Sequence, residues 1–187
     1  MSSEGRKRVA VFCGSKVGAN PIYTSHVAQL GTLLGKNNID IVYGGSHRGL
    51  MGSLANHALA NGSKVTGVLP EILMSREHQH DALTELIITQ DMHQRKKTMY
   101  EMGDAGIVLP GGFGTLDEFF EMLTWNQLSI HNKKIFILNS SGFYNHLIQH
   151  LEFLGKEEFL YDSIWDRLEK YENPETLVQA LCKEFNG

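Results

Sequence analysis

Residues 9–18 read Val-Ala-Val-Phe-Cys-Gly-Ser-Lys-Val-Gly, a short apolar run that passes directly into a glycine-containing loop. The first five residues show no polar alternation, which is typical of a parallel strand that is covered on both faces. Open α/β sheets bind their ligands at the carboxyl ends of such strands. This stretch therefore predicts an α/β fold with a site at one edge of the sheet.

The same pattern recurs along the 187 residues. Further strands are expected at residues 39–43, 65–69, 86–89, 105–109 and 135–138. Helical patterns lie between them at residues 22–35, 50–60, 92–102, 116–128 and 144–154, and a last helix follows Pro174, a residue suited to a first helical turn. The alternation predicts a Rossmann-like, doubly wound parallel sheet flanked by helices. No linker or repeat divides the chain, so we expect a single nucleotide-binding α/β domain over residues 1–187.

The composition excludes several classes of protein. Hydrophobic residues make up 42% of the chain, too many for a disordered protein. The net charge of -4 argues against a nucleic-acid binder. No apolar run is long enough for a membrane span or a secretory signal. The two cysteines, Cys13 and Cys182, are expected to be reduced thiols, which indicates a cytoplasmic protein.

Three glycine loops follow predicted strands and precede predicted helices. They occupy residues 14–18, 44–49 and 110–115. Helix starts offer free backbone N–H groups and the positive end of a dipole, so three such loops at one sheet edge indicate a ligand that carries phosphate. Gly49 is followed by Leu50 rather than by Lys, which departs from a P-loop, and Asp117 replaces the third glycine of a dinucleotide fingerprint. ATP and NAD are therefore disfavoured as ligands.

The pattern Thr115-Leu-Asp-Glu118 allows two interpretations. Thr-x-x-Glu is the sequence of a capping box, in which Thr115 caps a helix and Glu118 bonds back to the N-cap amide. Alternatively, a phosphate takes the helix N-terminus and Thr115, which leaves Glu118 free to face a ribose. The sequence alone does not choose between them.

Arg95 also allows two interpretations, because it shares a helix face with Met99 and Met102. The arginine is either a solvated side chain that extends to the surface or a guanidinium held near the ligand. Glu118 lies on a mostly apolar face, where burial would raise its pKa, whereas Glu121 is expected at the surface or an interface. His78 and His80 are expected to be solvated, without a metal. Cys13 has no evident base, which disfavours a thiol nucleophile.

Two long motifs resemble those of the LOG family, the cytokinin riboside 5'-monophosphate phosphoribohydrolases, whose members have often been labelled lysine decarboxylases. They are Pro110-Gly-Gly-Phe-Gly-Thr-Leu-Asp-Glu118 and Met92-His-Gln-Arg-Lys96. The shorter matches are Phe12-Cys-Gly-Ser15, Val42-Tyr-Gly-Gly45, Gly49-Leu-Met-Gly52 and Thr124-Trp-Asn-Gln-Leu128. A decarboxylase of that kind would need a Schiff-base lysine for pyridoxal phosphate, and nothing in the chain singles one out.

The resemblance implies roles for individual residues. Arg95 and Glu118 would be the catalytic pair. The residues implied to bind the phosphate or to line the substrate site are Ser15, Gly45, Glu77, Lys96, Gly111, Gly112, Phe113, Gly114, Thr115 and Thr124. Ser46 stands where many relatives have a third glycine, which weakens the expected ligand role of the second loop. The family also tends to form homodimers, and the helices around Met99, Met102 and Trp125 suit either a dimer face or the core.

The implied reaction is hydrolysis of the N-glycosidic bond of an adenosine 5'-monophosphate, with or without an N6 substituent, to free base and ribose 5-phosphate. Glu118 would stabilise the ribose cation or activate water. Arg95 would stabilise the departing base or fix the phosphate, and Glu77 would hold ribose hydroxyls. No metal or organic cofactor is required. The alternatives are an AMP nucleosidase, a transferase that uses the same sugar cation, and a non-catalytic nucleotide-binding module.

Overall fold

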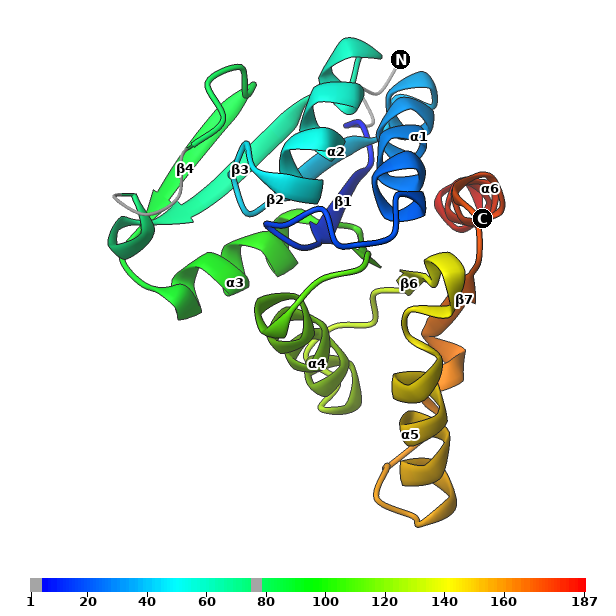
Figure 1. Ribbon diagram of the computed structural model, residues 1–187. Coiled ribbons are helices and arrows are strands. Elements are labelled where there is room, and N and C mark those ends of the chain that lie inside the picture. Colours follow the sequence, from blue (N-terminus) through cyan, green and yellow to red (C-terminus); the bar gives the residue numbers. More distant parts are fainter. Residues whose placement is uncertain (1–4, 75–78) are drawn as a thin grey trace.

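The computed structural model describes residues 5–74 and 79–187 (Figure 1). Seven parallel strands form one sheet in the order β4-β3-β2-β1-β5-β6-β7. The strands are β1 (Arg8–Phe12), β2 (Asp40–Tyr43), β3 (Val65–Pro70), β4 (Glu85–Thr89), β5 (Ala105–Val108), β6 (Ile135–Leu138) and β7 (Leu168–Tyr171). The predicted doubly wound parallel sheet is confirmed, because the order runs outward from β1 in both directions.

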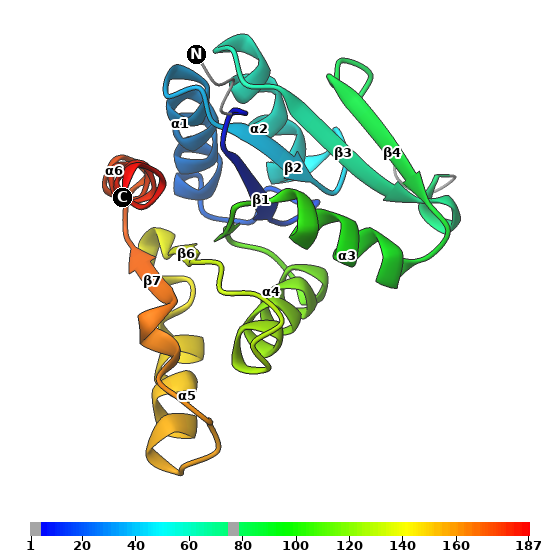
Figure 2. The ribbon, with the colours of Figure 1, turned by 180° about the vertical axis from the view of Figure 1, so that it is seen from behind.

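Six α-helices cover the two faces of this sheet (Figures 1 and 2). They are α1 (Ile22–Lys36), α2 (Gly49–Ala60), α3 (Met92–Met102), α4 (Phe113–Gln127), α5 (Asn145–Lys156) and α6 (Pro174–Asn186). Three short 3₁₀ turns accompany them, η1 (Glu71–Leu73), η2 (Ser140–Gly142) and η3 (Ile164–Asp166). No helix in the described ranges has the length and apolar content needed to cross a bilayer.

The core consists of two apolar layers, one on each side of the sheet. Val9 and Val11 of β1 point into the layer that α1, α2 and α6 close. Ala10 and Phe12, the alternate residues of the same strand, point into the layer of α3, α4 and α5. Successive side chains of a strand face opposite ways, so a strand buried on both faces needs apolar residues throughout. This requirement explains the uninterrupted apolar runs in the sequence.

The edge strand β7 was not expected from the sequence. Its residues 168–171 read Leu-Glu-Lys-Tyr, and only Leu168 is fully buried. Its pairing with β6 is supported by the ammonium of Lys134, which contacts the Glu169 carboxylate at 2.9 Å. An edge strand has a neighbour on one side only and accepts charged residues. β7 uses this freedom and has no apolar run, whereas β4, at the other edge, keeps the run by which it was found.

Gly52, in the first turn of α2, fixes the position of the preceding glycine loop. A Cβ built on Gly52 would lie 1.8 Å from the carbonyl oxygen of His47. Any side chain at this position would therefore push α2 away from residues 44–49, the loop that follows β2.

We expect Gly52→Ala to lower the free energy of unfolding by about 3 kcal/mol, the upper end of the cost of overpacking. Gly114→Ala is the matched control, because a Cβ at Gly114 would meet no described heavy atom within 4 Å. That variant should stay within about 0.5 kcal/mol of the wild type. Urea denaturation followed by circular dichroism measures both. Equal midpoints for the two variants would contradict the close packing of Gly52.

Candidate active site

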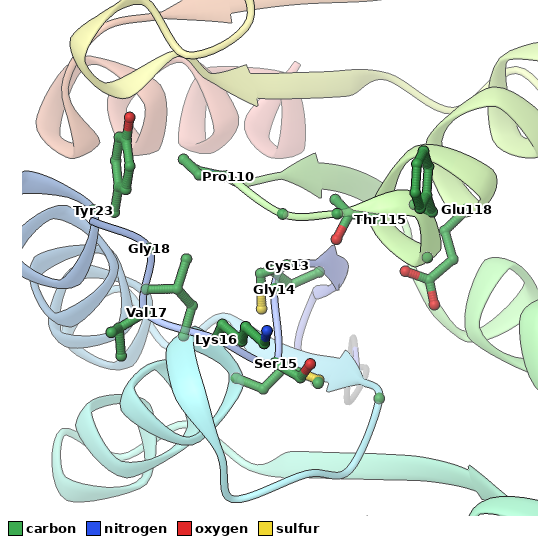
Figure 3. A pocket seen from close by; sticks show the side chains of 18 of the residues that line it. Cys13, Gly14, Ser15, Lys16, Val17, Gly18, Tyr23, Pro110, Thr115 and Glu118 are labelled. Carbon is green, nitrogen blue, oxygen red and sulfur yellow. The ribbon is translucent and has the colours of Figure 1, made fainter. Parts of the chain in front are cut away.

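A cleft of about 590 Å³ opens at the carboxyl edge of the sheet, where the loops after β1 and β5 meet (Figure 3). The strands β1 and β5 are neighbours at the centre of the sheet, and their connections leave in opposite directions. The two loops are joined by a hydrogen bond in which the Gly14 amide donates to the Pro110 carbonyl at 3.1 Å. This is the topological switch point at which open α/β sheets bind their ligands.

The N-terminus of α4 forms one wall of the cleft. The helix begins at Phe113, with Gly112 as its N-cap residue, and no described side chain caps it. The amides of its first turn are therefore free, and its dipole places partial positive charge at the cleft. Gly111 is required there, since a Cβ on it would lie 2.1 Å from the Thr115 hydroxyl oxygen. This wall of the cleft can accept an anion.

The capping-box interpretation of Thr115 and Glu118 is wrong. Thr115 is the third residue of α4 rather than its N-cap, and its hydroxyl has no hydrogen-bond partner among the described residues. Glu118 lies one turn further along and faces α3. The helix begins earlier than residue 116, the predicted start, because Gly112 adopts the extended conformation of an N-cap and its carbonyl accepts from the Leu116 amide.

Arg95 and Glu118 form an ion pair at the bottom of the cleft. The guanidinium Nη1 of Arg95 lies 2.7 Å from Oε1 of Glu118, and both side chains are only 8% exposed. Nε of Arg95 donates to the Val68 carbonyl at 3.0 Å. Gly44 makes room for the guanidinium, because a Cβ there would lie 2.5 Å from Nη2. The interpretation of Arg95 as a solvated side chain is therefore wrong.

The environment of Glu118 shifts its protonation equilibrium. Burial raises the pKa of the carboxyl above its ordinary value of 4.5, and the Arg95 guanidinium opposes that rise without cancelling it. Figure 3 shows the carboxyl group directed into the cleft. A carboxylate that is buried, paired on one side and open to a ligand on the other is suited to proton transfer or to stabilising a cation.

Cys13 also lines the cleft, but its thiol is unsuited to nucleophilic chemistry. Burial, reinforced by the charge of Glu118, raises the pKa of the thiol far above its ordinary value. The nucleophile of a cysteine enzyme is the thiolate, so this thiol remains protonated and acts as a packing residue.

Lys96 and Thr124 do not line the cleft. The buried ammonium of Lys96 lies 3.0 Å from the Asp117 carboxylate and 2.9 Å from that of Glu121. Burial lowers the pKa of Lys96, yet these two carboxylates outweigh it and leave the pKa raised. The exposed Thr124 donates its hydroxyl to the Phe120 carbonyl at 2.7 Å. The described chain therefore places both residues outside the site that the resemblance implied for them.

Glu121, which was expected at the surface or an interface, is a partly buried partner of α3. Its side chain is 26% exposed, and it accepts a hydrogen bond from the Tyr100 hydroxyl at 2.9 Å. The same hydroxyl also donates to the Glu118 backbone carbonyl oxygen, at 3.1 Å. Together with Lys96, these contacts hold α3 against α4 behind the ion pair.

The structure brings most of the other predicted site residues together. The predicted residues that line the cleft are Ser15, Arg95, Gly111, Gly112, Phe113, Gly114, Thr115 and Glu118. Gly45, which has a φ of +82°, is not among the residues that line the cleft, whereas its neighbour Gly44 is. Glu77 lies outside the described residues.

Several cleft residues were not assigned from the sequence. They are Lys16, Tyr23, Met51, Leu73, Met92 and Phe143. Lys16 lies in the glycine loop of residues 14–18, which was predicted from the sequence as part of a ligand site. Tyr23 and Phe143 carry no local motif, and they meet edge-to-face with ring centroids 5.5 Å apart.

Of the two histidines expected to be solvated, His78 lies outside the described residues and His80 is buried. Its Nδ1 accepts from the Ala82 amide at 3.2 Å, so its Nε2 donates to the Asn56 side-chain oxygen at 2.9 Å. Both ring nitrogens thus have structural partners. Within the described ranges, no cluster of three or more His, Cys, Asp or Glu side chains is placed to hold a metal ion.

The fold and the cleft define the class: a Rossmann-like α/β protein whose site combines a free helix N-terminus with a buried carboxylate–guanidinium pair. The family model described as "Possible lysine decarboxylase" matches residues 51–181. A cytokinin riboside 5'-monophosphate phosphoribohydrolase from Rhodococcoides fascians is 42% identical over 182 residues, which cover 97% of this chain and 86% of that protein. Another from Arabidopsis thaliana is 44% identical over 154 residues, 82% of this chain and 72% of that one. The chain therefore belongs to the LOG family, whose motifs it carries.

Solved structures at low identity share the fold. The molybdenum cofactor binding protein from Rippkaea orientalis superimposes with a TM-score of 0.74 at 21% identity, over 98% of this chain and 99% of that one. The molybdenum cofactor carrier protein from Chlamydomonas reinhardtii gives 0.75 at 15% identity, over 98% and 100%. These matches support the architecture alone.

We expect Arg95→Ala to lower the free energy of unfolding by about 3–5 kcal/mol near neutral pH, because it leaves Glu118 buried without its cation. A carboxyl whose pKa is raised in the folded state favours folding only while it is protonated. The deficit should therefore be smallest below pH 4.5, the ordinary pKa of the carboxyl, and grow as pH rises through the raised value. Urea denaturation across this pH range measures the deficit.

The double variant Arg95→Ala/Glu118→Gln is the control for this experiment. It lacks the ionisable carboxyl of Glu118. Its loss of unfolding free energy relative to the wild type should therefore not grow between pH 4.5 and about pH 8. A deficit that grows equally in the single and the double variant would show that Glu118 is not the titrating group.

Proposed function

We propose that this chain hydrolyses the N-glycosidic bond of a nucleoside 5'-monophosphate, releasing the free base and ribose 5-phosphate. One observation carries the proposal: the buried Arg95–Glu118 pair lies in the same cleft as the free N-terminus of α4. The relatives from Rhodococcoides fascians and Arabidopsis thaliana are named for this reaction on cytokinin riboside 5'-monophosphates. Their names support the same activity here.

The phosphate binds at the start of α4 in this proposal. The amides of Phe113, Gly114 and Thr115 and the Thr115 hydroxyl have no capping partner among the described residues, so they are available as donors. Binding a group remote from the reacting bond supplies energy that orients the sugar. Glu118 follows Thr115 by one turn of the same helix, so an anchored phosphate directs the ribose toward its carboxylate.

Glu118 acts on the ribose as the bond breaks. Cleavage leaves positive charge on the sugar ring, which a nearby carboxylate stabilises. A water molecule then forms the new bond to the anomeric carbon, and its proton replaces the sugar on the departing base. Arg95 holds the carboxylate in place through the 2.7 Å contact, and its opposing effect on the pKa favours the ionised form that the reaction uses.

The base lies against the apolar walls of the cleft. The apolar side chains that line it are Val11, Val17, Leu50, Met51, Leu73, Met92, Tyr23, Phe113 and Phe143. Apolar and aromatic walls with few polar groups are usual for sites that hold a planar ring. We include an N6 substituent on adenine as part of the proposal, and plain AMP as its alternative.

A substrate panel tests the proposal directly. The purified chain is incubated with AMP, with N6-alkylated AMP and with the matching nucleosides, and free base and ribose 5-phosphate are quantified. We expect the N6-alkylated monophosphate to be cleaved fastest and the nucleosides to be far poorer substrates. Preference for AMP would indicate an AMP nucleosidase. Binding without release of base would indicate a non-catalytic module, and transfer of the sugar to another acceptor would indicate a transferase.

The Glu118→Gln variant serves as the matched control in that panel. It should lower kcat by about 100- to 10,000-fold while nucleotide binding stays measurable. In the wild type, kcat/KM should fall on acidification with a midpoint above 4.5, because the reaction needs the ionised carboxyl and burial raises its pKa. Full turnover by the variant would remove Glu118 from the mechanism.

We also propose that the chain is a single nucleotide-binding domain that acts as a cytoplasmic homodimer. The face suggested by Met99 and Trp125 does not support this, because Met99 is fully buried and the Trp125 ring packs against Tyr100 at 5.1 Å. Support comes instead from the exposed apolar side chains of Phe120, Leu128 and Ile130, on α4 and just after it.

Light scattering after gel filtration should give about twice the chain mass of 21.0 kDa. Ile130→Asp should shift the protein toward the monomer, since a charge at an apolar interface is costly. Phe159→Asp is the control, because Phe159 is exposed between α5 and η3. A wild-type protein that elutes as a monomer would contradict the proposed dimer.

A further inference from the structure

Lys16 is one of three charged side chains among the described residues that line the cleft. The other two, Arg95 and Glu118, neutralise each other in their ion pair. No carboxylate within the described ranges lies at ion-pair distance from Lys16. Its ammonium is therefore the uncompensated charge that the described lining presents to a ligand.

The loop that carries Lys16 is packed against the start of α4. A Cβ built on Gly14 would lie 3.2 Å from the Lys16 carbonyl oxygen and 3.3 Å from Cα of Gly111. Lys16 and Gly111 thus flank the same point. In Figure 3 the ammonium end of Lys16 points away from Tyr23, toward the half of the cleft that holds Thr115 and Glu118.

The second glycine loop fixes the backbone of Lys16 from the other side. Gly49 has a φ of +58°, and a Cβ on it would lie 2.5 Å from the Lys16 amide nitrogen. This close approach holds the loop between α2 and α4, so its side chain emerges at a fixed place in the cleft. A fixed backbone lowers the entropy cost of placing a flexible lysine on a ligand.

We propose that Lys16 binds the phosphate of the substrate and supplies the counter-charge that the helix N-terminus cannot. The proposal rests on the proposed function. A phosphate monoester carries a charge of about -1.5 to -2 at neutral pH, whereas a helix N-terminus offers roughly half a positive charge. A lysine ammonium provides a full charge and a charge-assisted hydrogen bond. No other described cation of the cleft is free to do so.

Binding of ribose 5-phosphate, measured by titration calorimetry at low ionic strength, tests this without any turnover. We expect Lys16→Ala to raise the dissociation constant about tenfold, the loss of one charge-assisted contact. Lys16→Arg, which keeps the charge, should stay within about threefold of the wild type. Lys64→Ala is the matched control, because Lys64 is an exposed lysine beside the amino end of β3, at the opposite edge of the sheet. In turnover assays, Lys16→Ala should raise KM rather than lower kcat.

The outcomes separate this inference from the function on which it rests. Wild-type protein that does not bind ribose 5-phosphate would overturn the phosphate site and the proposed function with it. Wild-type binding that Lys16→Ala leaves unchanged would overturn the role of Lys16 alone. An equal loss in Lys64→Ala would show that the effect comes from the net charge of the protein. Added salt should weaken wild-type binding more than that of Lys16→Ala, and equal weakening would also contradict a direct contact.

Discussion

The ion pair between Arg95 and Glu118 is the constraint around which the site is arranged. Its two side chains come from different helices, α3 and α4, and meet where almost no water reaches. Buried charges are tolerated only when they are paired and their remaining hydrogen bonds are satisfied. The Val68 carbonyl takes one further donor of the guanidinium, and the Lys96–Glu121–Tyr100 contacts keep the two helices together behind the pair. Position and chemistry of the carboxylate thus depend on the same packing.

Burial on both faces of the sheet made most of the fold predictable. Five of the six strands found from the sequence are apolar runs because their alternate residues enter two different core layers. The sixth, β4, is an edge strand that keeps an apolar run although Ile88 is exposed. The strand β7 was missed for the opposite reason, since Glu169 and Lys170 are acceptable only at an edge. The starts of α1, α2, α3 and α5 were predicted to within one residue. Only α4 begins more than one residue earlier than predicted, at Phe113 rather than residue 116, because a glycine can cap it without a side chain.

The motifs predicted the loops of the site better than they predicted the contacts within it. Glycine loops at strand ends identify the ligand edge by themselves, because topology brings those ends together. Pairing between side chains does not follow from sequence spacing. Nothing local shows that Arg95 reaches Glu118 across 23 positions, or that Lys96, its neighbour, turns instead to Asp117. Free amides at the start of α4 were predicted from the glycine loop, but the competing capping box could be dismissed only from the folded chain, in which no described side chain caps this helix.

The lack of a side chain at Gly44 has a consequence for assigning function to related genes. The guanidinium of Arg95 occupies the volume that a Cβ at position 44 would fill. A related gene that encodes alanine or serine there while keeping arginine and glutamate at the paired positions would still specify the same sheet. Its product would have to move the guanidinium, so the carboxylate would lose its geometry although every residue credited with the reaction was present. Homology searches that score only those two residues would therefore label such pseudoenzymes as active.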